Sequence, residues 1–311
     1  MPTTNSADLF TELRPLVFSI GYRMLGSVAE AEDIVQETML RAHRELRAGT
    51  ELASPKAYIT AVATRLAIDQ LRSARVQRET YVGPWLPEPL LTDTSPGADV
   101  AATAELADSL SMAFLLVLER LTPVERAVFL LREAFDYGYD EIASVVGKSE
   151  DNCRQIAVRA RRHVDAERPR FEPSAAARDE LAARFFAAAQ EGELAGLEEL
   201  LAAGATLTGD GGGKAHAFPA PLVGRERVAH ALRAIFRQGA RLGATAEAVH
   251  VNGQPGIVAR DAGGAIVSVL TLEIAGGVVT AIRSVVNPDK LGHLGPLSDV
   301  GRRRRPRAPG A

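Results

Sequence analysis

Apolar positions recur with helical spacing through the first half of the chain, and short β-favouring runs replace them near its end. The stretch "AEAEDIVQETMLRAHREL" shows the helical pattern most clearly, because one apolar residue returns on the same side at each turn. These residues are Ala31, Val35, Met39, Ala42 and Leu46. The pattern predicts a first helical block over about 8–46 and a second helix from Pro55 to about Arg78.

A small, polar stretch over 92–103, "TDTSPGADVAAT", interrupts the helical pattern and predicts a flexible linker. Helical spacing resumes near Leu106. The segment "LTPVERAVFLLRE" then carries the signals of a helix start. Thr122 is the expected N-cap, Pro123 suits the first helical position, and Glu125 completes a capping box.

Residues 139–165 predict a helix-turn-helix, with a short helix that ends at Gly147 and a longer one that starts after Ser149. The polar side of the second helix carries Arg154, Gln155, Arg159 and Arg162. Arginine and glutamine have donors that suit guanine and adenine edges in the major groove. From the pattern alone, a solvated basic face on a helical bundle explains these residues equally well.

The last third predicts an α+β unit. It has helices over about 175–190 and 193–203, a glycine-rich segment over 206–224, and a helix over 225–238. Runs of β-favouring residues separated by glycine-containing turns follow to about residue 286, which predicts a curved sheet with helices packed against it.

Composition limits the remaining possibilities. A chain of 311 residues with 46% hydrophobic residues and a net charge of −3 predicts a soluble protein of several domains. It contains no apolar run of roughly 18 residues and no secretion signal at "MPTTNSADLF", so we expect a cytoplasmic protein without a membrane segment. Cys153 is the only cysteine, and the histidines lack metal-ligand spacing, so we expect no metal or other cofactor.

Two charged faces have open interpretations at this point. Asp33, Gln36 and Glu37 share one side of the first helical block, where they form either a solvated surface or a protein-docking face. Most charged residues of the helix over 56–79 are basic. They form either a solvated face or a face that contacts nucleic-acid phosphates.

The segment "DGGGK" at 210–214 does not fit a phosphate-binding loop. Such a loop requires glycine where Thr208 stands and serine or threonine where Ala215 stands. The glycines favour a tight turn instead, because they adopt backbone conformations closed to other residues.

Two long segments resemble a known family. "AEDIVQETMLRAHREL" with "SPKAYITAVATRLAIDQLR" resembles region 2 of the extracytoplasmic-function (ECF) sigma factors of bacterial RNA polymerase. "LERLTPVERAVFLLREAFDYGYDEIASVVGKSEDNCRQIAVRARRHV" resembles their region 4. The resemblance covers residues 8–166 and implies two all-α modules, a region 2 bundle and a region 4 helix-turn-helix.

The resemblance also implies partners and roles. Expected partners are the RNA polymerase core, through its β′ clamp and β subunit, and promoter DNA. Asp33, Gln36 and Glu37 match the surface that contacts the β′ coiled coil. Contacts to the −10 element are implied for Lys56, Arg65, Asp69 and Arg72. Contacts to the −35 element are implied for Arg154, Gln155, Arg159 and Arg162.

Residues 174–292 resemble the SnoaL-like branch of the NTF2-like fold, a cone-shaped α+β domain. Three short motifs are typical of ECF factors that carry this fused domain, the SigJ-like subgroup: "WLPEP" at 85–89, "DGGGK" at 210–214 and "NPDKL" at 287–291. The expected regulatory contacts are Trp85, Leu86, Pro87, Glu88, Asp210, Gly211, Gly212, Gly213, Lys214, Asn287, Pro288, Asp289 and Lys290.

The whole chain is therefore identified as an alternative sigma factor with a regulatory domain. The expected parts are region 2 (1–80), a linker (81–108), region 4 (109–168), the SnoaL-like domain (174–292) and a basic, disordered tail (293–311). We expect no enzymatic activity. The alternative is a ligand sensor or enzyme, with Asp210, His216, His250 and Glu273 as candidate groups in a pocket.

The single tryptophan leads to a specific hypothesis. Trp85 is flanked by prolines and is expected to dock as an anchor on the C-terminal domain, near "DGGGK" or "NPDKL". In that arrangement Glu88 is expected to pair with Lys214 or Lys290.

Overall fold

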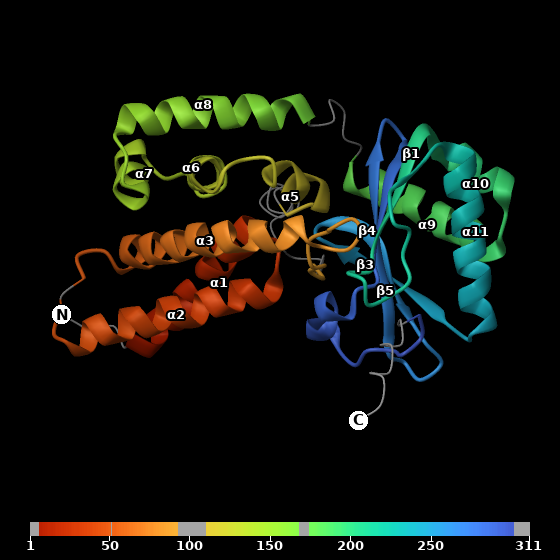
Figure 1. The fold of residues 1–311 in the computed structure, drawn as a ribbon, viewed down its shortest axis with the longest axis horizontal. Helices are drawn as coiled ribbons and strands as arrows, with labels where there is room; N and C mark the ends of the chain where they lie inside the picture. Colours follow the sequence, from red (N-terminus) through yellow and green to blue (C-terminus); the bar gives the residue numbers. More distant parts are fainter. Residues whose placement is uncertain (1–5, 51, 93–109, 168–173, 302–311) are drawn as a thin grey trace. The chain divides into compact units, whose positions relative to one another are not determined.

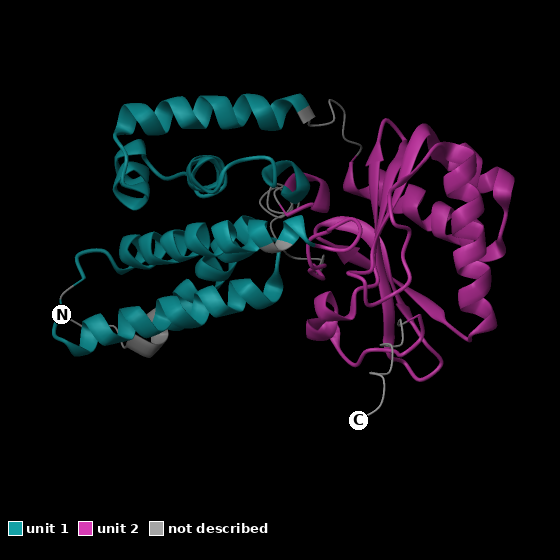
Figure 2. Ribbon diagram, in the orientation of Figure 1, with its two compact units in different colours: residues 1–80, 115–168 teal, residues 81–114, 169–311 magenta. Residues whose placement is uncertain are grey.

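The computed structural model describes residues 6–50, 52–92, 110–167 and 174–301. The chain divides into two compact units, residues 1–80 with 115–168 and residues 81–114 with 169–311 (Figure 2). Most of the predicted linker, the helix start near Leu106 and residues 302–311 of the tail lie outside the described residues. The first part of the tail differs from the expected disorder, because Leu297 pairs with Ile266 and Ser298 is buried.

The N-terminal part of the first unit contains α1 (Ser6–Leu25), α2 (Val28–Arg47) and α3 (Pro55–Glu79). The predicted single block over 8–46 is thus wrong, because the chain breaks between α1 and α2. Gly26 adopts a φ of 67°, which ends α1. The hydroxyl of Ser27 then accepts a hydrogen bond from the backbone NH of Glu30 and caps α2.

The C-terminal part of this unit follows the predicted helix signals closely. It includes α6 (Pro123–Glu133), α7 (Tyr139–Val146) and α8 (Glu150–Glu167), and α5 (Met112–Leu118) precedes them. Thr122 and Glu125 form the expected capping box, and Gly147 ends α7 in the left-handed conformation. Apolar side chains that include Val128, Leu131, Ile142, Cys153 and Ile156 hold the helix-turn-helix together.

The second unit contains a six-stranded sheet with helices on one face (Figure 1). Its elements are α9 (Ala175–Glu191), α10 (Leu194–Leu200), β1 (Leu201–Asp210), β2 (Leu222–Val223), α11 (Arg225–Arg241), β3 (Thr245–Val251), β4 (Gln254–Arg260), β5 (Ile266–Ala275), β6 (Val278–Val285) and two short 3-10 helices, η1 (Pro288–Lys290) and η2 (Gly292–Leu294). The strand order is β2-β1-β6-β5-β4-β3. Only the β1–β6 pair is parallel among these described strands.

The boundary between α10 and β1 differs from the sequence prediction. The helix expected over 193–203 ends at Leu200, and the strand that follows includes the first part of the glycine-rich segment. Pairing with β6 supplies the backbone hydrogen bonds of this strand, and its inward residues join the core. Tertiary pairing therefore decides a segment whose local composition is ambiguous.

Apolar side chains fill the space between the sheet and its helices. Phe185 from α9, Leu232 from α11, and Leu270 and Ile282 from the sheet are all buried in this core. The observed architecture confirms the expected fold class, two helical modules and a C-terminal α/β domain. Within the described residues, no helix is long and apolar enough to cross a membrane.

Candidate functional site

The outward face of α2 carries acidic residues and one exposed leucine. Asp33 and Gln36 are exposed, and Glu37 is partly exposed and pairs with Arg41 at 2.7 Å. Leu40 lies on the same face one turn further along, and 43% of its surface is exposed. The charge pattern predicted the acidic residues, but the exposed leucine was missed because it resembles a core position in the sequence.

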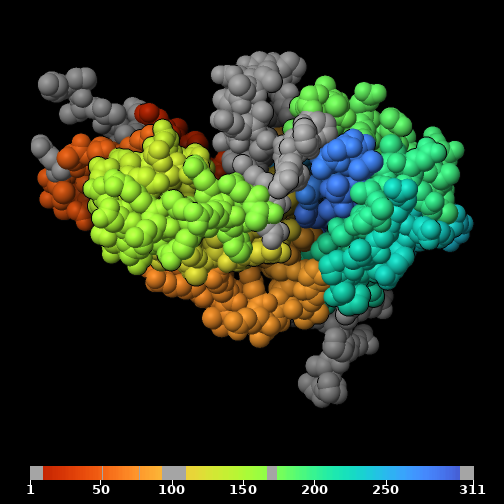
Figure 3. Space-filling model, turned by 90° about the horizontal axis from the view of Figure 1, so that it is seen from above, coloured from red at the N-terminus to blue at the C-terminus, as the bar shows by residue number. Residues whose placement is uncertain are grey.

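The outward face of α8 brings the predicted −35 residues together. Arg154, Gln155 and Arg159 line a shallow surface depression with Val158, which is 49% exposed. Arg162 is exposed further along the helix, and α8 shows its surface in yellow-green in Figure 3. The face therefore presents several cations and one apolar contact.

The predicted −10 residues Lys56, Arg65, Asp69 and Arg72 are all exposed on α3. Asp69 pairs with Arg72 at 2.8 Å. Arg65, however, is already engaged by the helix-turn-helix. Its Nε donates to the carbonyl of Val145 at 2.9 Å, and its Nη2 donates to the carbonyl of Ser144 at 2.8 Å. In this arrangement Arg65 caps the C-terminal end of α7 with two of its donors.

Other buried polar contacts join the two helical modules into one unit. The hydroxyls of Thr60 and Tyr137 lie 2.7 Å apart. The buried Arg126 donates to the carbonyl of Met24 at 2.7 Å and pairs with Glu119 at 2.7 Å.

Glu119 also pairs with Arg78 of α3. Burial raises the pKa of the Glu119 carboxyl, but Arg126 and Arg78 outweigh it and hold the pKa below its usual range. Burial in turn lowers the pKa of Arg126 to about 10, against the opposing effect of Glu119. These groups are therefore charged near neutral pH, and the contact between modules is ionic.

In the second unit, the prolines of "YVGPWLPEPLL" keep the linker extended, and the C-terminal domain binds it. Asp210, at the end of β1, is fully buried with 0% exposure. Its carboxylate accepts hydrogen bonds from the Tyr81 hydroxyl at 2.5 Å, the Leu86 backbone NH at 2.8 Å and the Lys290 ammonium at 2.7 Å. We call Tyr81, Leu86, Asp210 and Lys290 the linker node.

Lys290 completes the node from the other side. Its ammonium donates to the Leu86 carbonyl and lies 4.3 Å from the centre of the Trp85 ring and 5.0 Å from that of Tyr81. The linker thus contacts both Asp210 and Lys290, and a regulatory role for these contacts stays a prediction. The deepest anchor is Leu86, which is 1% exposed, whereas Trp85 is only partly buried and covers the lysine.

The protonation of Tyr81 suits this role. Burial raises the pKa of its hydroxyl, and the hydrogen bond to Asp210 raises it further. The hydroxyl therefore stays protonated and continues to donate to the carboxylate. Asn287 also contacts this hydroxyl group, because its Nδ2 donates a hydrogen bond to the Tyr81 oxygen at 2.8 Å.

The glycines of "DGGGK" allow the linker and the "NPDKL" segment to approach. A methyl group on Gly212 would lie 2.3 Å from Nδ2 of Asn287 and 2.9 Å from the Tyr81 oxygen. Gly212 also has a φ of 55°, which disfavours other residues. At the rim, Lys214 pairs with Asp289, and both are exposed. The pairing of Glu88 with Lys214 or Lys290 stays a prediction.

Asn252 binds the next part of the linker, and the sequence prediction missed it. Its backbone NH donates to the Leu90 carbonyl at 2.8 Å, and its Oδ1 accepts from the Leu90 NH at 3.0 Å. Its Nδ2 donates to the carbonyl of Leu110 at 2.9 Å. The "NG" dipeptide could have marked this position, because such pairs form tight hairpin turns with positive φ, and Asn252 has a φ of 54°.

The candidate catalytic groups do not gather in a pocket. Glu273 lies on the sheet face opposite the core, where it pairs with Arg283 at 2.6 Å. His250 pairs with Asp179 at 2.9 Å, and His216 is exposed. Asp210 is occupied by the linker.

Comparisons with known proteins agree with this architecture. A model of Sigma-70 region 2 matches residues 9–76, and one of Sigma-70, region 4 matches residues 111–164. The ECF RNA polymerase sigma factor SigJ of Mycobacterium tuberculosis (strain ATCC 25618 / H37Rv) is 37% identical over 90% of this chain and 91% of its own length. The probable ECF RNA polymerase sigma factor SigI of the same organism is 32% identical over 90% of this chain and 93% of its length. The crystal structure of SigJ matches with a TM-score of 0.74 at 33% identity, covering 94% of this chain and 100% of that one.

Proposed function

The chain belongs to the ECF sigma factors, and we propose that its C-terminal domain regulates promoter use. ECF sigma factors bind core RNA polymerase and direct transcription from specific promoters. In this proposal, the C-terminal domain acts by holding the linker between the two DNA-binding modules. The observation that carries this proposal is the linker node, in which one buried carboxylate accepts three hydrogen bonds, two of them from linker residues. A tethered domain suits this role, because tethering raises the effective concentration to about millimolar.

The acidic face of α2 is the proposed contact with the β′ coiled coil of core polymerase. Asp33, Gln36 and Glu37 point outward and need no rearrangement of the helix to reach a partner. We add Leu40 to this surface, because an exposed apolar side chain among charges is typical of an interface centre.

Contact with the −10 element is assigned to Lys56, Arg65, Asp69 and Arg72 on α3. Two donors of Arg65 are held by the carbonyls of Ser144 and Val145. We therefore propose that this arrangement is a closed state of the free sigma factor and that promoter binding releases Arg65 from α7.

The −35 element is assigned to the α8 face. Arg154, Gln155, Arg159 and Arg162 supply donors for bases and phosphates, and Val158 adds an apolar contact that fits a thymine methyl group.

Single alanine substitutions of Arg154, Arg159 and Arg162 should distinguish the arginines that contact bases from those that contact phosphates. Loss of a base-contacting arginine should cost about 1–3 kcal/mol and relax the preference at one −35 position, whereas loss of a phosphate contact should weaken all sequences equally. Binding to a library of −35 sequences measures both effects. Arg161→Ala is the matched control, because Arg161 lies on the same helix outside the surface depression and pairs with Glu133. Unchanged promoter-specific initiation after alanine substitution of Arg154, Gln155, Arg159 and Arg162 together would refute the assignment.

The packed interior of the C-terminal domain supports docking over catalysis. Apolar side chains that include Phe185 and Leu232 fill the space between the sheet and its helices. Its similarity to sigma factors likewise supports the proposal of a non-enzymatic protein that acts in the cytoplasm.

Regulation through the linker is tested by placing a charge at a buried position of the linker. Leu86→Asp should undock the linker, since Leu86 is buried while the change leaves the C-terminal domain itself untouched. Run-off transcription by Leu86→Asp with core polymerase should then differ from that by the unmodified protein. Val82→Asp should transcribe like the unmodified protein, because Val82 lies in the same segment but is 61% exposed. Equal transcription from both variants would contradict the proposal.

A further inference from the structure

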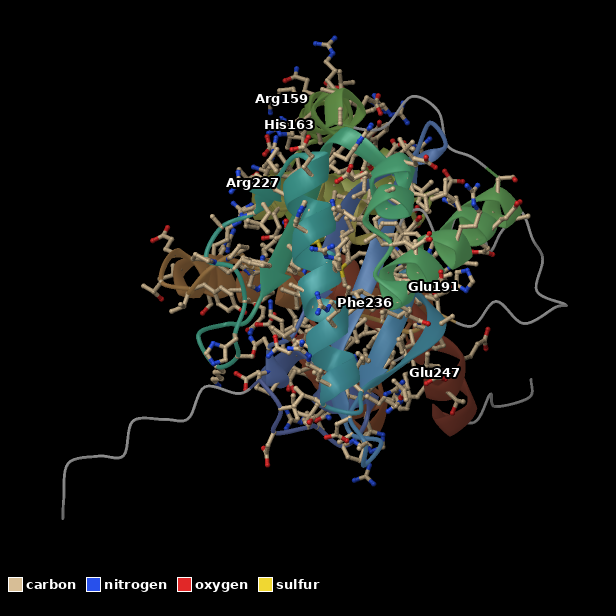
Figure 4. All side chains as sticks on the ribbon, turned by 90° about the vertical axis from the view of Figure 1, so that its right-hand side faces the viewer. Arg159, His163, Glu191, Arg227, Phe236 and Glu247 are labelled. Atoms are coloured by element: carbon tan, nitrogen blue, oxygen red, sulfur yellow. The ribbon has the colours of Figure 1, made fainter. Side chains whose placement is uncertain are left out.

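One face of α11 gathers positive charge away from the site described above. Val228, Ala229 and Leu232 bury the inner face of this helix against the core. The opposite face carries Arg227, His230, Arg237 and Arg241, all exposed. Their spacing places them within one outward stripe of a 3.6-residue helix. Figure 4 labels Arg227, the first residue of this stripe.

The arginines of this stripe have no acidic partner among the described residues. Elsewhere in the same domain, Arg260 pairs with Glu247 at 3.3 Å, and Arg283 pairs with Glu273 at 2.6 Å. The only acid on α11 is Glu226.

The stripe concentrates positive charge in one place. The whole protein has a net charge of −3, so this local excess of arginine is not a property of its average composition. Neighbouring α10 carries Glu198 and Glu199, and Glu193 is its N-cap residue, so the positive surface is limited to the outer face of α11. A row of one sign on a chain of mixed charge is typical of a surface that attracts an anionic partner.

We propose that the outer face of α11 binds phosphates of promoter DNA, as a contact independent of the two sigma modules. Arginine presents several donors in a planar fork that matches phosphate oxygens. Arg227, Arg237 and Arg241 span about 20 Å along the helix at 1.5 Å per residue, a length over which duplex DNA carries many charges. The other anionic partner, an acidic protein surface, is less favoured because the protein already acts on DNA.

The test combines Arg227→Gln, Arg237→Gln and Arg241→Gln in the full chain, bound to core polymerase. DNA affinity is measured over a range of salt concentrations on promoter and non-promoter duplexes. Each lost phosphate contact should reduce the magnitude of the slope of log affinity against log salt by roughly 0.9. The slope of the triple variant should therefore be smaller by about 2–3 on both duplexes. Arg260→Gln, which removes a paired arginine in the same domain, should leave the slope unchanged.

An unchanged slope in the triple variant would overturn the proposal. If that variant instead lost affinity for core polymerase with its DNA slope intact, the stripe would bind an acidic protein surface, and the proposal would again be wrong. Both outcomes are separate from the linker proposal, whose readout is transcription by Leu86→Asp.

Discussion

Asp210→Ala should release the linker from the C-terminal domain and shift the fluorescence of Trp85 toward that of a water-exposed tryptophan. The substitution removes the carboxylate that accepts hydrogen bonds from Lys290, from the Tyr81 hydroxyl and from the Leu86 NH. Breaking a buried ion pair in this way costs about 3–5 kcal/mol. Trp85 is the only tryptophan, so its emission reports the change directly.

The domain itself should survive this substitution. The backbone carbonyl of Asp210 still accepts hydrogen bonds from the amides of Val286 and Asn287, so β1 keeps its connection to the "NPDKL" segment. Asp289→Ala is the matched control, because its ion pair with Lys214 is exposed and contributes at most about 1 kcal/mol. Identical emission spectra for the two variants would show that Asp210 does not hold the linker.

Asp33→Arg combined with Glu37→Arg should abolish binding to core polymerase. Both side chains face outward on α2, so reversing their charge places two cations against the partner surface with little effect on helix packing. Pull-down of core polymerase measures the loss, and an unchanged circular dichroism spectrum shows that the fold persists. Glu45→Arg, on another side of the same helix, should bind normally. Normal binding by the double variant would remove α2 from the polymerase interface.

Local signals predicted much of the helical half. The capping box at Thr122 and Glu125 and the left-handed Gly147 depend on neighbouring residues only, so the sequence contains everything needed to place them. The motifs around Trp85, Asp210 and Lys290 also identified the segments that meet.

Contacts between distant residues could not be predicted. The end of α10 at Leu200 is decided by pairing of β1 with β6, about eighty positions later. Arg65 was expected at DNA, but the carbonyls that bind it belong to α7, which no periodicity connects to α3. The roles of Leu40 and Asn252 depend on exposure and on partner strands in the same way.

The linker node also gives the motifs a physical meaning. The aspartate of "DGGGK" and the lysine of "NPDKL" form one buried pair, and the linker supplies the remaining polar groups and the Leu86 anchor. The glycine at 212 is required because Asn287 and Tyr81 occupy the space of any side chain there. The three motifs are therefore parts of one contact.

The most direct test of the central claim is transcription from promoters whose −35 and −10 elements are separated by spacers of different length. If the C-terminal domain holds the linker, the unmodified protein should initiate over a narrow range of spacers, and Leu86→Asp should broaden that range while Val82→Asp does not. A spacer profile that is identical for the unmodified protein and Leu86→Asp would contradict the account.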